Sequence, residues 1–137
     1  MQTQLPLTQL IDLALSGDMT FERLEQLASQ SSTSAPELLN QLSIYVAKCY
    51  ATEQLAYDEA DAVMNAAFCL ATSPELWAAY DRTAPEDVMR VYMAFDEGEY
   101  HHPDDARDID PEIKYTKPLI TQFLRDKQLT SKHQVIE

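Results

Sequence analysis

Residues 53–72 read EQLAYDEADAVMNAAFCLAT, and this segment indicates the fold more clearly than any other part of the chain. Apolar residues recur along it at the spacing of one helix face, and polar residues occupy the opposite face. From residue 62 onward almost every position is small or apolar, so we expect other helices to cover this half on most sides. The apolar run is too short, and its first half too charged, to span a bilayer. The segment predicts a buried central helix with an apolar face of Ala56, Tyr57, Ala60, Val63, Met64, Ala67, Phe68 and Leu70.

Further helices are predicted on both sides of this segment. Thr20, Ser34 and Ser73 stand where a helix N-cap is expected, because their side-chain oxygens can accept from a free backbone N–H of the first turn. No stretch shows the sustained period-two alternation of a strand. We predict an all-α fold, a single-domain helical bundle of about six to seven helices over residues 1–127, with residues 128–137 frayed. The predicted flanking helices span residues 5–16, 21–28, 35–49, 74–81 and 84–96, and a last one runs from Asp110-Pro111-Glu112 to near Lys127 with an interruption at Pro118.

Length and composition agree with one globular domain. The chain has 137 residues, of which 45% are hydrophobic and 24% charged, and this balance is typical of a folded protein. Only two glycines occur, Gly17 and Gly98. Folds that need many tight turns, or a glycine-rich loop around a phosphate, are therefore excluded.

The net charge of −13 points to the class of partner. Binding nucleic acid through its phosphates requires the opposite sign, so we expect no direct nucleic-acid partner. The charge is also uneven, because residues 96–112 hold eight acidic side chains and one basic side chain. Such a concentration can steer a basic protein partner toward this region. The alternative is that the acidic surface only maintains solubility.

The N-terminus and the two cysteines predict a cytoplasmic protein. The first ten residues, MQTQLPLTQL, lack the basic and apolar parts of a secretory signal. Cys49 and Cys69 both lie on predicted apolar helix faces, which favours two buried, reduced thiols. Spacing alone leaves open whether these cysteines pair, and the sequence does not decide the oligomeric state.

Motif searches predict a protein that is not an enzyme and that holds no cofactor. The sequence contains no H-E-x-x-H, G-x-S-x-G, C-x-x-C or nucleotide-binding glycine motif. One alternative is a small metal-dependent hydrolase that uses the histidines and aspartates of residues 101–110. The acidic residues there do not follow the EF-hand order, because the place of its glycine, counted from Asp104, is taken by Ile109.

Residues 97–112 form the candidate binding region. This segment is polar and acidic, contains two prolines and shows no helical face, so we predict a long loop, a feature that often carries function. Tyr100 offers an aromatic anchor surrounded by carboxylates, which suits recognition of a basic protein surface. The alternative is an ordinary solvated loop. The predicted partner-binding residues are Asp96, Glu97, Glu99, Tyr100, His101, His102, Pro103, Asp104, Asp105, Asp108 and Asp110.

The order of residues in this region resembles the recognition region of colicin-type nuclease immunity proteins. The resemblance covers about residues 97–125 and consists of Tyr100-His-His-Pro103, an acidic run, Pro111-Glu112 and an amphipathic helix. It implies a small acidic helical protein that inhibits a basic toxin, with Tyr100, Pro103 and the neighbouring carboxylates at the interface. This chain is longer than the family pattern, and His102 replaces a second tyrosine before the proline. Another interpretation is a DNA mimic, whose carboxylates take the place of phosphates.

Overall fold

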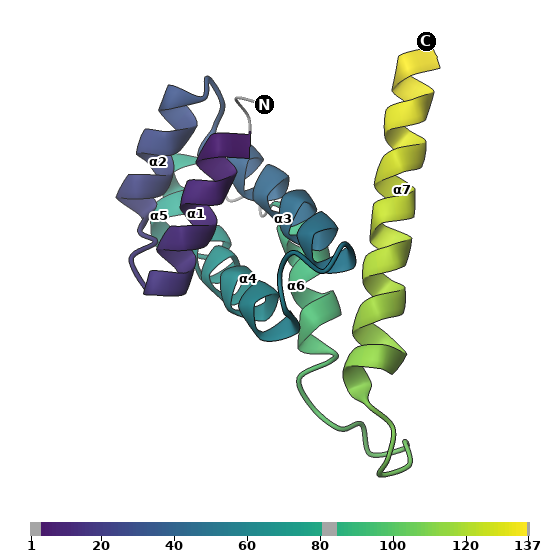
Figure 1. The fold of residues 1–137 in the computed structure, drawn as a ribbon. Helices are drawn as coiled ribbons and strands as arrows, with labels where there is room; N and C mark the ends of the chain where they lie inside the picture. Colours follow the sequence, from purple (N-terminus) through teal and green to yellow (C-terminus); the bar gives the residue numbers. More distant parts are fainter. Residues whose placement is uncertain (1–3, 81–84, 137) are drawn as a thin grey trace.

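The protein is an all-α bundle with one long helix beside it (Figure 1). The computed structural model describes residues 4–80 and 85–136. Within these ranges there are seven α-helices and one π-helical turn, and no strand, which confirms the predicted fold class. The elements are α1 (Gln4–Ser16), α2 (Phe21–Gln30), α3 (Ala35–Ala51), α4 (Tyr57–Ala71), α5 (Pro74–Ala79), α6 (Glu86–Asp96), the π-helical turn η1 (Glu112–Thr116) and α7 (Lys117–Ile136).

The centre of the bundle is formed by α3, α4 and α6, which pack against one another. Helix α1 lies against α3 and α4, while α2 packs on α3 and the short α5 on α4. The core contains large side chains such as Leu42, Met64 and Phe95 that are fully removed from solvent. Nine residues of α3 are buried, compared with five of α4, so α3 is the more enclosed helix.

Helix α4 differs from the sequence prediction in its start and in its outer face. It begins at Tyr57 and not at Glu53, which adopts a left-handed turn conformation (φ 64°) just after α3 ends. Ala62, Asn65 and Cys69 are exposed and share one face, so the second half is covered on most sides, as predicted, but keeps one open stripe. The predicted burial of the Cys69 thiol is therefore wrong, whereas Cys49 is buried as expected. The physical reason is that the neighbouring helices cover only part of the circumference of α4, and small residues do not require burial.

Local side-chain caps fix the starts of three helices, as predicted. The Thr20, Ser34 and Ser73 hydroxyls accept hydrogen bonds from the N–H groups at the third residue of the helix that each precedes, at 3.2, 3.3 and 3.3 Å. Each of these bonds satisfies one of the backbone donors that have no partner inside the helix. The starts of α2, α3 and α5 therefore follow from short sequence motifs.

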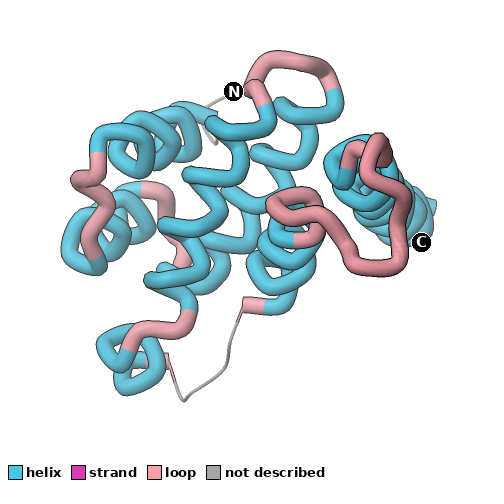
Figure 2. Tube along the Cα trace, turned by 90° about the horizontal axis from the view of Figure 1, so that it is seen from below, coloured by secondary structure: helices cyan, strands magenta, loops and turns pink. Residues whose placement is uncertain are grey.

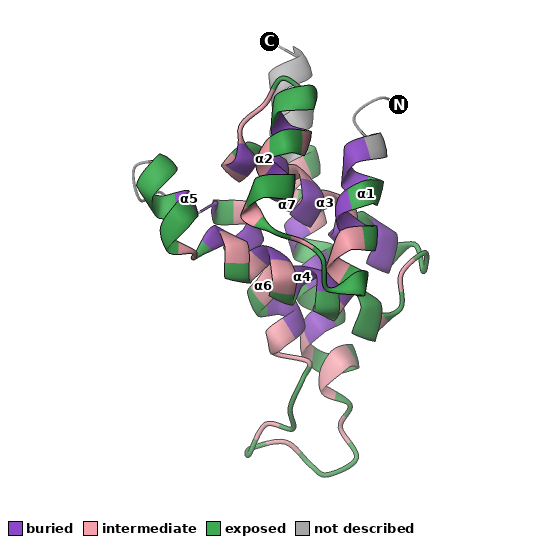
Figure 3. Cartoon of the chain, turned by 90° about the vertical axis from the view of Figure 1, so that its left-hand side faces the viewer, coloured by how far each residue is buried: buried purple, intermediate pink, exposed green. Residues whose placement is uncertain are grey.

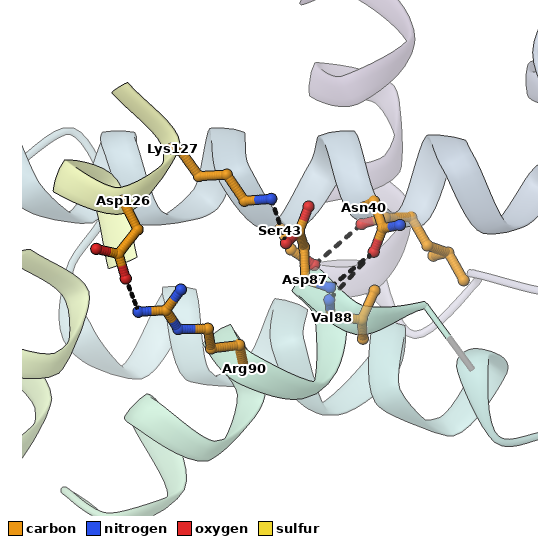
Figure 4. A network of polar contacts seen from close by, with 8 residues as sticks. Asn40, Ser43, Asp87, Val88, Arg90, Asp126 and Lys127 are labelled. Carbon is orange, nitrogen blue, oxygen red and sulfur yellow. Dashed lines mark hydrogen bonds and ion pairs between the residues drawn. The ribbon is translucent and has the colours of Figure 1, made fainter. Parts of the chain in front are cut away.

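Helix α6 is capped by a side chain from another helix. Pro85 precedes α6 and supplies no side-chain cap, and the predicted first residue Ala84 lies outside the described ranges. The Asn40 side-chain oxygen, on α3, accepts from the N–H groups of Asp87 (3.0 Å) and Val88 (3.3 Å), as Figure 4 shows. This contact joins two central helices and stabilises the start of one of them.

Helix α7 docks on α3 and α6 through apolar residues and ion pairs. Ile120 and Phe123 are buried. Lys127 pairs with Asp87 on α6 at 2.7 Å, and Asp126 pairs with Arg90. Figure 4 shows that the contacts of Lys127 and Asn40 meet at Asp87, so one region of α6 connects to both α3 and α7.

The predicted interruption at Pro118 is a change of helix type rather than a break. The Lys117 N–H donates to the Glu112 carbonyl, the i to i+5 pattern of a π-helix, and Pro118 then enters α7 in its first turn. Proline lacks an N–H, and the first turn of a helix tolerates this loss. Helix α7 continues to Ile136 and does not end near Lys127. Fraying of residues 128–137 remains a prediction.

Candidate functional site

The candidate site is the acidic loop, residues 97–111, which connects α6 to η1. The loop extends from one end of the bundle (Figure 1), and a view along that end shows it between α6 and α7 (Figure 2). Its residues are exposed or partly buried, and none is fully buried (Figure 3). The loop therefore presents its side chains outside the hydrophobic core.

A set of buried and partly buried polar contacts fixes the two ends of the loop. The Thr116 hydroxyl donates to the Ala94 carbonyl at 2.7 Å, and the Tyr57 hydroxyl donates to the Phe95 carbonyl at 2.6 Å. Both carbonyls lie in the last turn of α6, where the donors of a continuing helix are missing, and the Phe95 carbonyl also accepts from the Gly98 N–H at 3.1 Å. The Tyr50 hydroxyl donates to the Glu112 carboxylate at 2.6 Å, so α3 is joined to η1. The base of the loop is thus fixed by α3, α4 and η1.

Aromatic packing reinforces this base. The rings of Tyr50, Tyr57 and Phe95 lie within 5.0 to 6.3 Å of one another, with the two contacts of Tyr50 close to edge-to-face. Such pairs contribute beyond the area that they bury. Burial is also the main cause that raises the pKa of the Tyr50 and Tyr57 hydroxyls, so both remain protonated donors.

Three rings stack inside the acidic loop and on η1. His102 lies between Tyr100 and Tyr115, with centroid distances of 4.4 and 3.9 Å and interplanar angles of 24° and 27°. His102 Nε2 is 2.9 Å from the Glu97 carbonyl oxygen, and the Tyr100 hydroxyl donates to the Glu97 carboxylate at 3.0 Å. The latter hydrogen bond raises the pKa of Tyr100. Tyr100 remains 47% exposed, so the stack orders the predicted anchor without covering it.

The Asp105 side chain points toward η1 and away from solvent. Its carboxylate pairs with Lys114 and accepts from the Tyr115 hydroxyl at 2.6 Å, and its side chain is only 7% exposed. The hydrogen bond from Lys114 is the main cause that lowers the pKa of Asp105. The sequence predicts Asp105 as a partner-binding residue of the same kind as Asp104. In the free protein this carboxylate instead holds the loop to η1.

The other predicted partner-binding residues fall into two groups, one partly buried and one exposed. Asp96, Glu97 and His102 are partly buried, and their positions close to α6 and η1 explain why. Asp110 is exposed, although one of its carboxylate oxygens accepts from the Glu112 N–H at 2.9 Å. The outer surface of the loop carries Glu99, Tyr100, His101, Pro103, Asp104, Asp108 and Asp110.

The structure does not assemble the ligands of the hydrolase alternative. His101 Nε2 lies 2.8 Å from the Ala106 carbonyl oxygen, and His102 is held in the ring stack, so the two imidazoles have separate partners. In the parts of the chain that the structure describes, no group of three or more His, Cys, Asp or Glu side chains could hold a metal ion. The two cysteines are both free, and burial raises the pKa of the Cys49 thiol.

Three residues at the site were not predicted from the sequence. Lys114 and Tyr115 bind Asp105, and Asp61 lies on α4. Burial is the main cause that raises the pKa of Asp61 to about 7, and the neighbouring acidic groups Glu99 and Asp96 act in the same direction. Lys114 and Tyr115 could have been noticed in the sequence as a basic and an aromatic residue close to the acidic loop. Nothing in the sequence places Asp61 beside the loop.

None of the helices between residues 4–80 and 85–136 is both long and apolar enough to cross a membrane. No family model matches this chain, and comparisons with curated proteins and with solved structures find no match either.

Proposed function

We propose that this chain is a non-enzymatic protein-binding protein whose acidic loop recognises the basic surface of a partner protein. The sharpest form of the proposal is an immunity or inhibitor protein that neutralises a basic toxin, such as a nuclease. The observation that carries the proposal is the ordered presentation of an exposed aromatic ring, Tyr100, among exposed carboxylates. The resemblance to colicin-type nuclease immunity proteins supports the same class of function.

The loop is prepared for binding in two ways. Its base is fixed by the contacts of Tyr50, Tyr57 and Thr116, and its interior by the ring stack and by Asp105. A loop that is ordered before association loses less conformational entropy when a partner binds. The exposed carboxylates can then steer a basic surface, and Tyr100 can fill a pocket after encounter.

The test uses the protein encoded beside this chain as the probe, because immunity proteins are commonly encoded next to their toxins. Association and dissociation rates are measured at two salt concentrations for the wild type and for loop variants. Asp104→Asn combined with Asp108→Asn should slow association and flatten its salt dependence. Tyr100→Ala should mainly speed dissociation.

A matched control separates local from overall charge. Glu22→Gln removes an exposed acidic side chain from α2, a helix that lies away from the loop (Figure 1), and should leave both rates close to those of the wild type. If Glu22→Gln and the loop substitutions had equal effects on the rates, the loop would act only through the net charge of the whole protein. Unchanged rates for both loop variants would place the interface elsewhere and overturn the proposal. Failure of the neighbouring protein to bind would remove the immunity role.

A further inference from the structure

We propose that Asp105 is a positioning residue for Tyr100, the aromatic anchor of the acidic loop. Its carboxylate acts through the hydroxyl of Tyr115 and the imidazole of His102, and in this way it sets the plane of the Tyr100 ring. In this role Asp105 does not need to touch the partner. The effect on binding rests on the proposed function, whereas the position of the ring is a property of the free protein and can be tested without a partner.

Tyr115 on η1 is contacted at two points of its side chain by one turn of the loop. Its hydroxyl donates to the Asp105 carboxylate at 2.6 Å, and its ring stacks on His102 with 3.9 Å between the centroids. The Asp105 N–H donates to the His102 carbonyl at 3.0 Å, so both contacts come from the ends of one backbone turn. Holding the Tyr115 hydroxyl therefore holds the ring plane against which His102 packs.

His102 transfers this plane to Tyr100. It lies between the two tyrosine rings, and the interplanar angles of 24° and 27° show that the three rings are close to parallel. The Tyr100 hydroxyl also donates to the Glu97 carboxylate at 3.0 Å, which fixes one atom of the side chain. A single contact at the hydroxyl leaves the ring free to rotate about it. The stack on His102 supplies the second contact, and this contact sets the orientation of the ring.

The two partners of Asp105 differ in what they can transmit. Lys114 is 48% exposed, and solvent weakens both its ion pair with Asp105 and its contact with the Tyr115 ring, whose centroid lies 5.3 Å from Nζ. The Tyr115 hydroxyl donates to a carboxylate that is only 7% exposed, and a hydrogen bond to an ionised acceptor is stronger than one between neutral groups. Asp105 therefore acts on the ring stack mainly through Tyr115.

Three variants of the full chain separate positioning from charge. Tyr115→Phe keeps the ring and every charge and removes only the hydroxyl. Asp105→Ala and Asp105→Asn remove the same charge, but asparagine keeps an oxygen that can accept from Tyr115. Positioning predicts that Tyr115→Phe and Asp105→Ala act alike, and that Asp105→Asn behaves much like the wild type. Asp104→Ala, at the exposed neighbour of Asp105, is the matched control.

The first measurement is NMR on the free protein at one fixed pH. In the wild type the His102 ring protons lie between two tyrosine rings, so their resonances should be shifted upfield, with NOEs to the Tyr100 ring. Tyr115→Phe and Asp105→Ala should weaken these NOEs and move the resonances toward those of an unstructured chain. Asp105→Asn and Asp104→Ala should retain both signals. Unchanged amide resonances of the α4 interior, such as that of Val63, show that each variant is folded.

The second measurement is binding kinetics with the protein encoded beside this chain. Tyr115→Phe should raise the dissociation rate about fivefold, the effect of one hydrogen bond of typical net strength. Its association rate and salt dependence should equal those of the wild type, because no charge changes. In a Tyr100→Ala background the same substitution should have no further effect on dissociation, because the anchor on which it acts has been removed.

Three results would overturn the positioning role. The first is a wild-type ring stack in folded Tyr115→Phe, and the second is an equal effect of Asp105→Asn and Asp105→Ala, which would assign the effect to charge. The third is a Tyr115→Phe effect on dissociation that persists in full without the Tyr100 ring. If the neighbouring protein does not bind the wild type, the proposed function fails, and the NMR comparison alone supports or overturns the positioning of Tyr100.

Discussion

The hydroxyl of Thr116 occupies the space that a side chain at Gly98 would need. A Cβ atom built on Gly98 would lie 2.2 Å from Thr116 Oγ1 and 3.3 Å from the Glu112 backbone. Thr116 is buried and donates to the Ala94 carbonyl, so its hydroxyl is not free to move aside. Glycine is required at this position because the chain after α6 passes directly against η1, and not because of its backbone conformation.

Gly98→Ala should therefore destabilise the protein by roughly 1–3 kcal/mol, the range of overpacked sites. Thermal and urea unfolding measure the loss. The matched test is a double-mutant cycle with Thr116→Ala, which opens the space and should recover part of the loss caused by Gly98→Ala. Strictly additive effects of the two substitutions would show that the two side-chain positions do not compete.

Phe123 should be the main apolar contact that holds α7 to the bundle. Its side chain is 1% exposed, and the Arg90 guanidinium lies 5.2 Å from its ring centroid. Phe123→Ala should reduce the free energy of unfolding by about 3–5 kcal/mol, as for other buried aromatic residues. Leu119→Ala, on an exposed position of the same helix, should cost less than about 1 kcal/mol. Urea unfolding of both variants checks the difference, and similar losses would mean that α7 is docked by another face.

Asn40 should contribute to stability through a cap on a helix other than its own. Asn40→Ala removes the oxygen that accepts from Asp87 and Val88, and should cost about 1–2 kcal/mol, the value of a lost N-cap. Asn40→Asp keeps an acceptor at the same place and adds a charge that the helix N-terminus favours, so it should retain most of the stability. Unfolding by urea at neutral pH measures both. Equal losses in the two variants would contradict the cap.

Asp61 should make overall stability depend on pH. Its pKa in the folded protein is raised to about 7 from an ordinary value of 3.8, so the folded state prefers the protonated form. The stability that it contributes is fully present below about pH 4 and is lost as the pH rises to about 7. Asp61→Asn should consequently match the wild type at low pH and exceed it at pH 8, by about 1 kcal/mol once solvent screening is allowed for.

Urea unfolding at pH 4.5, 6 and 8 follows this prediction. Asp58→Asn is the control, because that carboxyl is exposed on the same helix and should leave the pH dependence unchanged. A wild type and an Asp61→Asn variant with parallel stability curves over this range would show that the carboxyl is not perturbed in the folded protein.

The candidate site could be predicted in position but not in internal structure. A polar acidic segment with prolines and no helical face marks a loop, and residues 97–111 form one. The inward direction of Asp105 could not be inferred, because it depends on Lys114 and Tyr115 lying beside it. Asp104 and Asp105 are adjacent residues of the same type. Only the fold makes the Asp104 carboxylate exposed and the Asp105 carboxylate paired.

The sequence by itself determined the elements whose causes are local. Apolar spacing placed the helices, and the caps at Thr20, Ser34 and Ser73 act on N–H groups three residues away. The tertiary structure alone decided the contacts between distant residues, such as Asn40 with the start of α6 and Tyr50 with Glu112. It also decided which small residues of α4 are exposed, because burial depends on how much of a helix its neighbours cover. Local hydrogen bonds and periodicity can be read along a chain, whereas burial and long-range pairing exist only once the helices have packed.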